Sequence, residues 1–491
     1  MGKAVGIFVA VYFVVIILIS VIANKKTVEK TTGDFYVASN SLGPVLIFCA
    51  AFATAFSAFS FMGQMGQVFV QGSSAIFNYM TYSFFAWPPA LLIGKRIWYF
   101  GKKYGYVTPA DMLVHRYQSN TPMRIIIGLF VCVYCSVFYI VININGTAWA
   151  LETVTGMNPI MAKALVCIVL AIYVNIGGFR GAAYVDAMQF VFIMLGVIVL
   201  AFAAIHVNGG FSELYMRLDE VNPSMWLPKQ PFITMFTGSI TMCVSIIVWP
   251  TIWTRCYAAK SLRANWAVSV GMGSGTVVVT VGTPLIIVAG IMIAYANQDP
   301  SRADTFVIRY AMESVNPVIA VIVIGGLVSA ALSTAASLTL LGSSVFTKDL
   351  PKCFPSFAEK TNDKNLLVMG RVINVVIIFI CFLVSLRPMG SLIQAGISFT
   401  YPGYFLTFPI VVGGFFWKRA NKEGAIAGLL VGIATIITTT YIVPTPFGIA
   451  TGIWGVAMCT IAFILVSLNT PPTGQKTLEQ FGLIKSKKEG A

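Results

Sequence analysis

The 491-residue chain is poor in charged side chains and in histidine. Charged residues make up 10% of it and hydrophobic residues 57%, whereas ordinary soluble domains carry roughly 25% charged residues. A water-soluble surface cannot be built from this composition, which excludes an ordinary soluble globular protein. The only two histidines, His115 and His206, leave little scope for metal sites built from imidazoles.

The chain also lacks any polar stretch that is long enough for a soluble domain. Its longest polar connections are 95–121, 207–231, 296–316 and 347–365. Each is too short to bury a core of its own. The net charge of +15 does not indicate nucleic-acid binding, because the basic residues lie between apolar runs and not on one folded face. We therefore expect no nucleic-acid partner, and nothing in the sequence indicates an obligate protein partner.

What the sequence has instead is a series of long apolar runs. About 20 apolar residues are needed for a helix to cross the hydrocarbon core of a bilayer. That length predicts thirteen spans, near 4–23, 42–70, 75–94, 125–151, 158–178, 184–206, 232–254, 265–295, 317–346, 366–386, 389–417, 424–443 and 446–468. The first is expected to be a retained span and not a signal peptide, because no small-residue cleavage site follows it. The predicted fold class is an all-α polytopic protein that lies in the lipid bilayer.

The basic residues predict the orientation of these spans. When the loops are assigned to alternate sides, 25 of the 32 Lys and Arg fall on one side, and the side rich in basic residues is cytoplasmic. We therefore expect a multi-pass protein of the inner or plasma membrane, with the N-terminus outside and the C-terminus in the cytoplasm. The tail after Leu468 is predicted to be a disordered cytoplasmic end.

The second predicted span, 42–70, is too long and too interrupted for one straight helix. Small and hydroxyl-bearing residues concentrate near its middle, at Ala53–Ser60 and Gly63–Gly66. Broken helices are tolerated at membrane depth where they line a cavity, and their freed carbonyls are ready ligands for sodium. Close helix packing through small residues is the alternative interpretation.

The ninth span carries a second group of hydroxyls. Ser333 and Ser337 share one helical face, and Thr334 lies beside them. Neutral hydroxyls and carbonyls are oxygen ligands that bind sodium without trapping it. The same side chains can also simply bond back to their own helix.

The seventh span contains Ser245, Trp249 and Pro250. Proline removes one helical hydrogen bond and predicts a second broken helix, five spans after the first. Two interrupted helices in corresponding positions are typical of an inverted repeat. We therefore divide the chain into an extra N-terminal helix with its loop, a first repeat, a second repeat and two peripheral helices with a tail. These units are 1–40, 41–231, 232–417 and 418–491.

Of the seventeen acidic residues, only Asp186 lies inside a predicted span, near the cytoplasmic start of that span. An ionisable group there is costly and is by default a candidate functional residue. The alternative is an interfacial carboxylate that pairs with Arg180 or with a cation from a loop.

Along nearly its whole length the sequence resembles the sodium:solute symporter family, whose members include proline, pantothenate, sugar and sialic acid carriers with a LeuT-like core of five plus five helices. The resemblance is carried by the order and spacing of several short motifs. These are Ser41–Pro44, Gly177–Arg180 followed by Asp186 and Gln189, the Ser-Ala-Ala-Leu-Ser-Thr sequence that ends at Thr334, and Trp417–Arg419 leading to Gly424 and Ala425.

The resemblance implies a co-transported sodium ion held by backbone carbonyls and two hydroxyls. Matched by motif, its ligands would come from Ala53, Phe56, Ala330, Ser333 and Thr334. Some relatives hold a further sodium ion with an aspartate that resembles Asp186 and with hydroxyls that match Ser333 and Ser337. Ala336 stands where those relatives have another serine, which weakens the expectation of this second site.

Among the branches, the pantothenate carriers are the most similar, through Val107–Leu113, Arg116–Ser119, Thr254–Cys256 and Arg419–Asn421. These stretches mostly lie in loops, which do not recognise the solute. The side chains expected to face the solute cavity are Ala55, Ser57, Ser60, Ser245 and Trp249. The proline carriers have an aspartate where this chain has Ala55, which weakens a proline assignment.

The resulting hypothesis is a sodium-coupled symporter that imports a small organic solute by alternating access. Pantothenate or a related monocarboxylate is the first candidate, and a proline-like amino acid or a sugar is the alternative. A membrane enzyme would need a catalytic set of side chains, which the short loops do not offer. A channel would need a continuous pore, whereas paired broken helices favour a site that is closed at mid-membrane.

Overall fold

The structure is a computed structural model that describes residues 2–25, 31–85, 87–119, 121–354, 361–387 and 400–485. Within these ranges the regular secondary structure is helical, apart from one isolated bridge between Leu42 and Ala259. The predicted all-α class is therefore confirmed.

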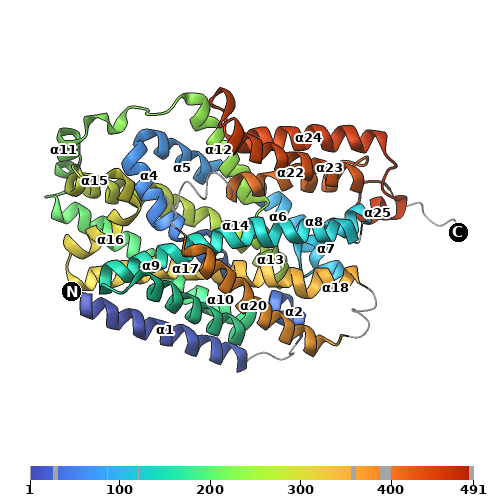
Figure 1. Cartoon of the computed structure of the whole chain (residues 1–491), viewed down its shortest axis with the longest axis horizontal. Helices are drawn as coiled ribbons and strands as arrows, with labels where there is room; N and C mark the ends of the chain where they lie inside the picture. The colour runs from blue at the N-terminus through green and yellow to red at the C-terminus, as the bar shows by residue number, and fades with distance from the viewer. Residues whose placement is uncertain are drawn as a thin grey trace.

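Long helices lie side by side and run in the same general direction along the molecule (Figure 1). Short helices lie at the two ends of this bundle, with α11 (Phe211–Val221) and α16 (Ala303–Glu313) at one end and α7 (Pro109–Tyr117) and α25 (Gln475–Gln480) at the other. Helix α1 (Gly2–Lys25) begins at the end that holds α16. The chain thus begins and finishes at opposite ends of the bundle, which agrees with an odd number of crossings.

The first half of the bundle contains two interrupted stretches and a short helix before the first of them. After α1 come α2 (Thr32–Val37), α3 (Pro44–Ala55), η2 (Phe59–Gly63), α4 (Gln64–Gln71), α5 (Ser73–Phe85), α6 (Trp87–Tyr104), α8 (Thr121–Leu129), η3 (Phe130–Val137), α9 (Phe138–Thr155) and α10 (Pro159–Val207).

The second half follows α11 and the short η4 (Pro223–Trp226). It comprises α12 (Phe232–Ile247), α13 (Pro250–Ala258), α14 (Leu262–Thr276), η5 (Val277–Gly282), α15 (Thr283–Tyr295), α17 (Pro317–Ser344), η7 (Val345–Asp349), α18 (Leu350–Cys353), α20 (Asp363–Ser385), α22 (Tyr401–Phe416), α23 (Lys422–Ile437), η9 (Thr438–Ile442) and α24 (Thr451–Asn469).

Eight helices of the described chain are long and apolar enough to cross a membrane, or nine when the bent pair α3 and η2–α4 counts as one span. Each of the thirteen predicted spans overlaps a helix or a run of helices. The first part of the 389–417 span lies outside the described residues. The two predicted spans at 158–178 and 184–206 form the single long helix α10, which is interrupted at Gly178.

Gly178 is required by the backbone at that interruption. Its φ of 53° and ψ of −152° are rarely adopted by residues with a side chain. A Cβ at this position would also lie 2.7 Å from the ring of Phe35. Two helices that the sequence predicts as separate spans therefore meet at a sharp corner with little connecting chain.

Helix α17 lies at the centre of the bundle, and its side chains from Val323 to Ser344 are all buried. Asn316 caps its first turn with its side-chain oxygen, and Pro317 follows at the first helical position, the usual start of a helix. Small residues let α17 approach α10 closely, since a Cβ on Gly326 would lie 2.7 Å from the carbonyl oxygen of Phe192.

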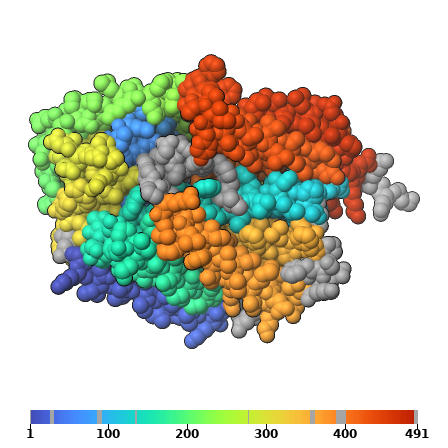
Figure 2. Space-filling view, viewed as in Figure 1, coloured from blue at the N-terminus to red at the C-terminus, as the bar shows by residue number. Residues whose placement is uncertain are grey.

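The outermost helices expose apolar side chains. Ile7 on α1, Phe379 on α20 and Leu465 on α24 are each more than half exposed. Helix α20, in orange, crosses the face of the molecule that Figure 2 shows. Such surfaces are stable against lipid and not against water, which fits a protein with several membrane spans.

The tail after Leu468 is ordered to residue 485, so the prediction of a disordered end is wrong over this stretch. Helix α25 docks against α7, where Gln118 Nε2 donates to Thr477 Oγ1 at 2.8 Å. The ring of Phe481 stacks on Phe100 with 4.5 Å between centroids. Apolar anchors, with Phe481 and Leu478 both buried, and a few polar side chains therefore hold a segment whose composition resembles that of a loop.

Candidate functional site

The first predicted broken helix is confirmed. Helix α3 ends at Ala55, Phe56 has an extended backbone, and the chain resumes as a helix bent by 56° from α3. The backbone N–H of Ala58 donates to Asn143 Oδ1 at 3.0 Å, and the hydroxyls of Ser57 and Tyr139 are 2.9 Å apart. Polar groups on α9 thus satisfy part of the opened backbone, as the apolar surroundings require.

Hydroxyls on α17 satisfy the carbonyls on the other side of the break. Ser333 Oγ donates to the carbonyl of Ala53 at 2.7 Å. Thr334 Oγ1 lies 2.9 Å from the carbonyl of Phe56 and 3.0 Å from that of Thr54. The same two hydroxyls also lie 3.0 and 3.2 Å from the carbonyl of Ala330 within their own helix.

The structure therefore brings together the residues matched to the sodium site, namely Ala53, Phe56, Ala330, Ser333 and Thr334. All five are buried. Bonding back to the helix and bonding across to the break both occur, so neither interpretation of the hydroxyls excludes the other. Three carbonyls and two hydroxyls converge without a formal charge, and neutral oxygens are the ligands that a hard monovalent cation takes from a broken helix. Below we call these five residues the oxygen cluster.

Asp186 is buried and pairs with an arginine that the sequence places in a loop. Arg255 Nη2 lies 3.6 Å from Asp186 Oδ2, and both side chains are 2% exposed. Arg180, the other candidate partner, instead pairs with Asp34 at 2.8 Å. Arg255 also donates to the hydroxyl of Ser337, so Asp186 and Ser337, two of the three residues that the resemblance assigns to a further sodium ion, both contact this guanidinium.

The second predicted interruption is present between α12 and α13. Val248 and Trp249 leave the helical conformation, and Pro250 begins α13. The ends of the two broken stretches are tied together at the isolated bridge, where Leu42 N donates to Ala258 O and Lys260 N donates to Leu42 O, both at 3.0 Å.

The five predicted solute-facing residues are all buried. Ser245 Oγ donates a hydrogen bond to the carbonyl oxygen of Tyr401 at 2.6 Å. Trp249 packs against Tyr139 and Tyr404, with ring centroids 6.2 and 5.9 Å apart. Its indole N–H has no hydrogen-bond partner among the described residues. A buried donor without a partner is costly and uncommon in folded proteins.

Side chains from far apart in the sequence thus converge on the two breaks, and comparison with known proteins identifies the arrangement. The sequence profile of the sodium:solute symporter family matches residues 35–432. The chain belongs to this family. Its members are transporters and not enzymes, so the symporter is expected to carry a solute together with sodium, in agreement with the motifs.

Characterised relatives of the symporter differ in their named solutes. The osmoregulated proline transporter of Bacillus subtilis is 26% identical over 98% of this chain and 97% of that protein. The sodium/pantothenate symporter of Escherichia coli is 27% identical over 86% of this chain and 87% of that protein. At this identity the family and sodium coupling are shared, while the solute is left unspecified.

Solved structures confirm the fold of the symporter. A sodium-coupled sialic acid symporter in a substrate-bound, outward-open state superimposes with a TM-score of 0.77 at 17% identity, over 96% of this chain and 99% of that one. Mhp1, a nucleobase-cation-symport-1 family transporter, superimposes with a TM-score of 0.60 at 13% identity, over 93% of this chain and 100% of that one. The expected LeuT-like architecture is therefore confirmed, whereas the exact repeat boundaries stay a prediction.

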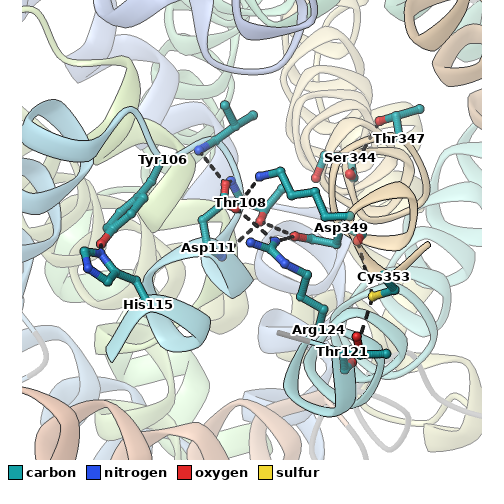
Figure 3. Close-up of polar contacts among 12 residues, drawn as sticks. Tyr106, Thr108, Asp111, His115, Thr121, Arg124, Ser344, Thr347, Asp349 and Cys353 are labelled. Carbon is teal, nitrogen blue, oxygen red and sulfur yellow. Dashed lines mark hydrogen bonds and ion pairs between the residues drawn. The ribbon is translucent and has the colours of Figure 1, made fainter. Parts of the chain in front are cut away.

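A charged network joins α7 to the end of the helix that carries the oxygen cluster (Figure 3). Arg124 Nη1 lies 2.9 Å from Asp111 Oδ1 and 2.5 Å from Asp349 Oδ1. Lys352 Nζ lies 2.7 Å from Asp111, and Thr108 donates to Asp349 at 2.9 Å.

Asp111, on the loop helix α7, has a lowered pKa. Burial raises its pKa, but the charges of Lys352 and Arg124, with hydrogen bonds from Lys352 and from the backbone N–H of Val107, outweigh this effect and bring it to about 2. Asp111 is therefore ionised at neutral pH, and the network closes the end of the bundle beneath α17 with paired charges.

Sequence reasoning missed four contributors to the site, namely Asn143, Tyr139, Tyr401 and Arg255. One signal was present, because an amide such as Asn143 in the middle of an apolar span must find a polar partner. The tyrosines gave none, since aromatic residues in spans are more often packing residues. Arg255 was counted with a cytoplasmic loop because it follows an interrupted span.

Proposed function

We propose that the symporter imports a solute that carries a carboxylate group, with pantothenate as the first candidate, by alternating access. Sodium binds between the first break and α17 and orders the side chains around the two breaks. Solute then binds, and the broken helices rock against α17. A ligand shifts such an equilibrium only by its differential affinity for the two states, so coupling requires that sodium binds more tightly when the solute site is formed.

The oxygen cluster is the observation that carries the sodium site. Its three carbonyls come from the opened α3 and from α17, and its two hydroxyls lie within hydrogen-bonding distance of those carbonyls. Bound sodium would be coordinated by these same oxygens. Because these ligands are neutral, the ion is released when the helices separate and the ligand set comes apart.

The polarity of the broken helices supports a carboxylate solute. Helices η2 and α13 both begin at the breaks, so their N-termini lie there. Helix N-termini carry a partial positive charge. The buried indole N–H of Trp249 adds a donor without a described partner. Proline, pantothenate and sialic acid, the solutes named for the similar proteins, each carry one carboxylate.

Uptake by the purified symporter in proteoliposomes tests this proposal. Labelled pantothenate, proline and glucose are offered with an inward sodium gradient, and then with choline in place of sodium. We expect sodium-dependent uptake of pantothenate and little uptake of glucose. Proline uptake without pantothenate uptake would keep the carboxylate class and move the solute to the second candidate, a proline-like amino acid. Uptake of glucose alone would contradict the proposal.

The orientation is also part of the proposal, with α7 and α25 on the cytoplasmic side. The basic residues of the loops support it through the positive-inside rule. Single cysteines at Lys476, which is exposed on α25, and at Arg302, which is exposed at the opposite end, provide the test. A membrane-impermeant thiol reagent applied to intact cells should label position 302 and spare position 476. The reverse pattern would contradict this orientation.

A further inference from the structure

Arg255 lies inside the helix bundle although it directly follows an interrupted span. It is on α13, and its guanidinium Nη2 donates to the hydroxyls of Thr54 and Ser337. The carboxylate of Asp186 lies 3.6 Å from the same nitrogen. The ring of Phe179 covers the guanidinium, with 5.2 Å between the ring centroid and Cζ. A fixed positive charge is therefore enclosed by three oxygen-bearing side chains and an aromatic ring.

The three oxygen-bearing side chains come from three different helices. Thr54 belongs to α3, Asp186 to α10 and Ser337 to α17. The hydroxyls of Thr54 and Ser337 are 3.2 Å apart, on the side of the guanidinium that they share. Two hydroxyls and a carboxylate are a set of oxygens that binds a hard monovalent cation. Here this set faces a guanidinium, which stays protonated at every physiological pH.

This enclosed charge borders the oxygen cluster directly. The carbonyl of Thr54 accepts from Thr334 at 3.0 Å, and Ser337 Oγ donates to the carbonyl of Ser333 at 2.9 Å. Arg255 thus places a permanent positive charge beside the neutral oxygens of the cluster, with the carboxyl group of Asp186 3.6 Å from its Nη2. One sodium ion at the cluster then adds one net charge to the bundle.

We propose that Arg255 is a resident cation in a second cation position formed by Thr54, Asp186 and Ser337, so that a single sodium ion accompanies each solute molecule. The inference rests on the proposed sodium site and specifies its stoichiometry. The guanidinium cannot leave the position, and it repels any further cation from it. Without the guanidinium, Asp186 is a buried carboxyl group beside two hydroxyls, and its ionised form requires a cation as partner. A second sodium ion supplies it.

Sodium binding to the purified full-length chain tests this inference without knowledge of the solute. Binding of ²²Na⁺ is titrated at pH 8 for the wild type, Arg255→Met, Arg255→Lys and the double variant Arg255→Met with Asp186→Asn. We expect one ion per chain for the wild type and for the lysine variant. The methionine variant should bind two ions with a sigmoidal isotherm, and the double variant should return to one.

The outcomes separate the two proposals. A wild type that binds no sodium overturns the proposed sodium site itself. A wild type that binds two ions, or a methionine variant that folds and still binds one, overturns only the role of Arg255. If the methionine variant does not fold, as judged by its thermal melting, the wild-type count still decides, because two bound ions contradict the inference.

Discussion

Thr334 on α17 reaches the opened backbone of the first broken helix, where its Oγ1 lies 2.9 Å from the carbonyl oxygen of Phe56. These residues are 278 positions apart in the chain, and they belong to the two elements that must separate if the bundle rocks. The contact explains why the break is stable in an apolar interior, since a buried carbonyl without a partner is costly. It also marks where a cation would exert its effect on the closure of the break.

Replacing Ser333 by alanine should lower the apparent affinity of the symporter for sodium. The substitution removes one of two hydroxyls of the oxygen cluster, and a lost interaction of about 1.4 kcal/mol corresponds to a tenfold change in affinity. We expect the sodium concentration that gives half-maximal solute uptake to rise by about tenfold. Ser329→Ala is the matched control, because Ser329 lies on the same helix but its Oγ hydrogen-bonds to the hydroxyl of Tyr12, 2.8 Å away. Equal shifts in the two variants would remove Ser333 from the site.

Trp249→Phe should lower the affinity for the solute and leave sodium binding unchanged. The substitution keeps an aromatic ring between Tyr139 and Tyr404 but removes the indole N–H together with the five-membered ring that carries it. Losing one hydrogen bond to a charged group costs about 1.5 to 3 kcal/mol, so the solute concentration for half-maximal uptake should rise at least about tenfold. Sodium binding measured without solute should not change. A variant with normal solute affinity would show that this N–H does not contact the solute.

Asn143→Ala should destabilise the symporter by leaving the N–H of Ala58 buried without its acceptor. Such an orphaned donor costs about 1 to 3 kcal/mol, which thermal melting in detergent measures as a lower midpoint. Thr147→Val, one turn further along α9, is the control, because among the described residues the Thr147 hydroxyl bonds back to the carbonyl of Asn143. A midpoint lowered as much by the control would point to general packing of α9 and not to the capped break.

Asp111→Asn tests the charged network at the end of α17. The pKa of Asp111 lies near 2 in the folded chain, below its unfolded value of about 3.9, so its ionisation contributes stability that is present above pH 4 and lost as the pH falls through 2. The variant should lose about 2 kcal/mol of unfolding free energy at pH 7. This loss should shrink on acidification as the pH falls towards 2.

The control for the network is Glu423→Gln. Glu423 pairs with Lys422 at 3.6 Å on an exposed surface, where an ion pair contributes less than about 1 kcal/mol. Melting curves of both variants between pH 3 and 8 give the comparison. A difference between Asp111→Asn and the wild type that grows on acidification would contradict the lowered pKa.

The sequence predicted those parts of the site that depend on local chemistry. A run of small residues and hydroxyls around Ala53 marked the first break, Pro250 marked the second, and helical spacing placed Ser333 and Ser337 on one face. It could not predict contacts that depend on how distant helices pack. The pairing of Asp186 with Arg255 joins residues of α10 and α13, and no spacing rule connects them.

The wrong prediction of a disordered C-terminal tail has a similar cause. A stretch with Pro471, Pro472 and several lysines has the composition of a disordered tail. Its order comes from the buried side chains of Phe481 and Leu478 and from hydrogen bonds to residues at the end of α7, such as Gln118. Composition reports on the average tendency of a segment, whereas one well-placed anchor decides whether that segment docks.

The account depends most on sodium binding between the first break and α17, and ²²Na⁺ binding to purified Thr334→Ala and Thr334→Ser measures this directly. The serine variant keeps the hydroxyl and removes only the methyl group. We predict that it binds sodium within about twofold of the wild type, and that the alanine variant binds about tenfold more weakly or not detectably. Undiminished binding by a folded alanine variant would contradict the account.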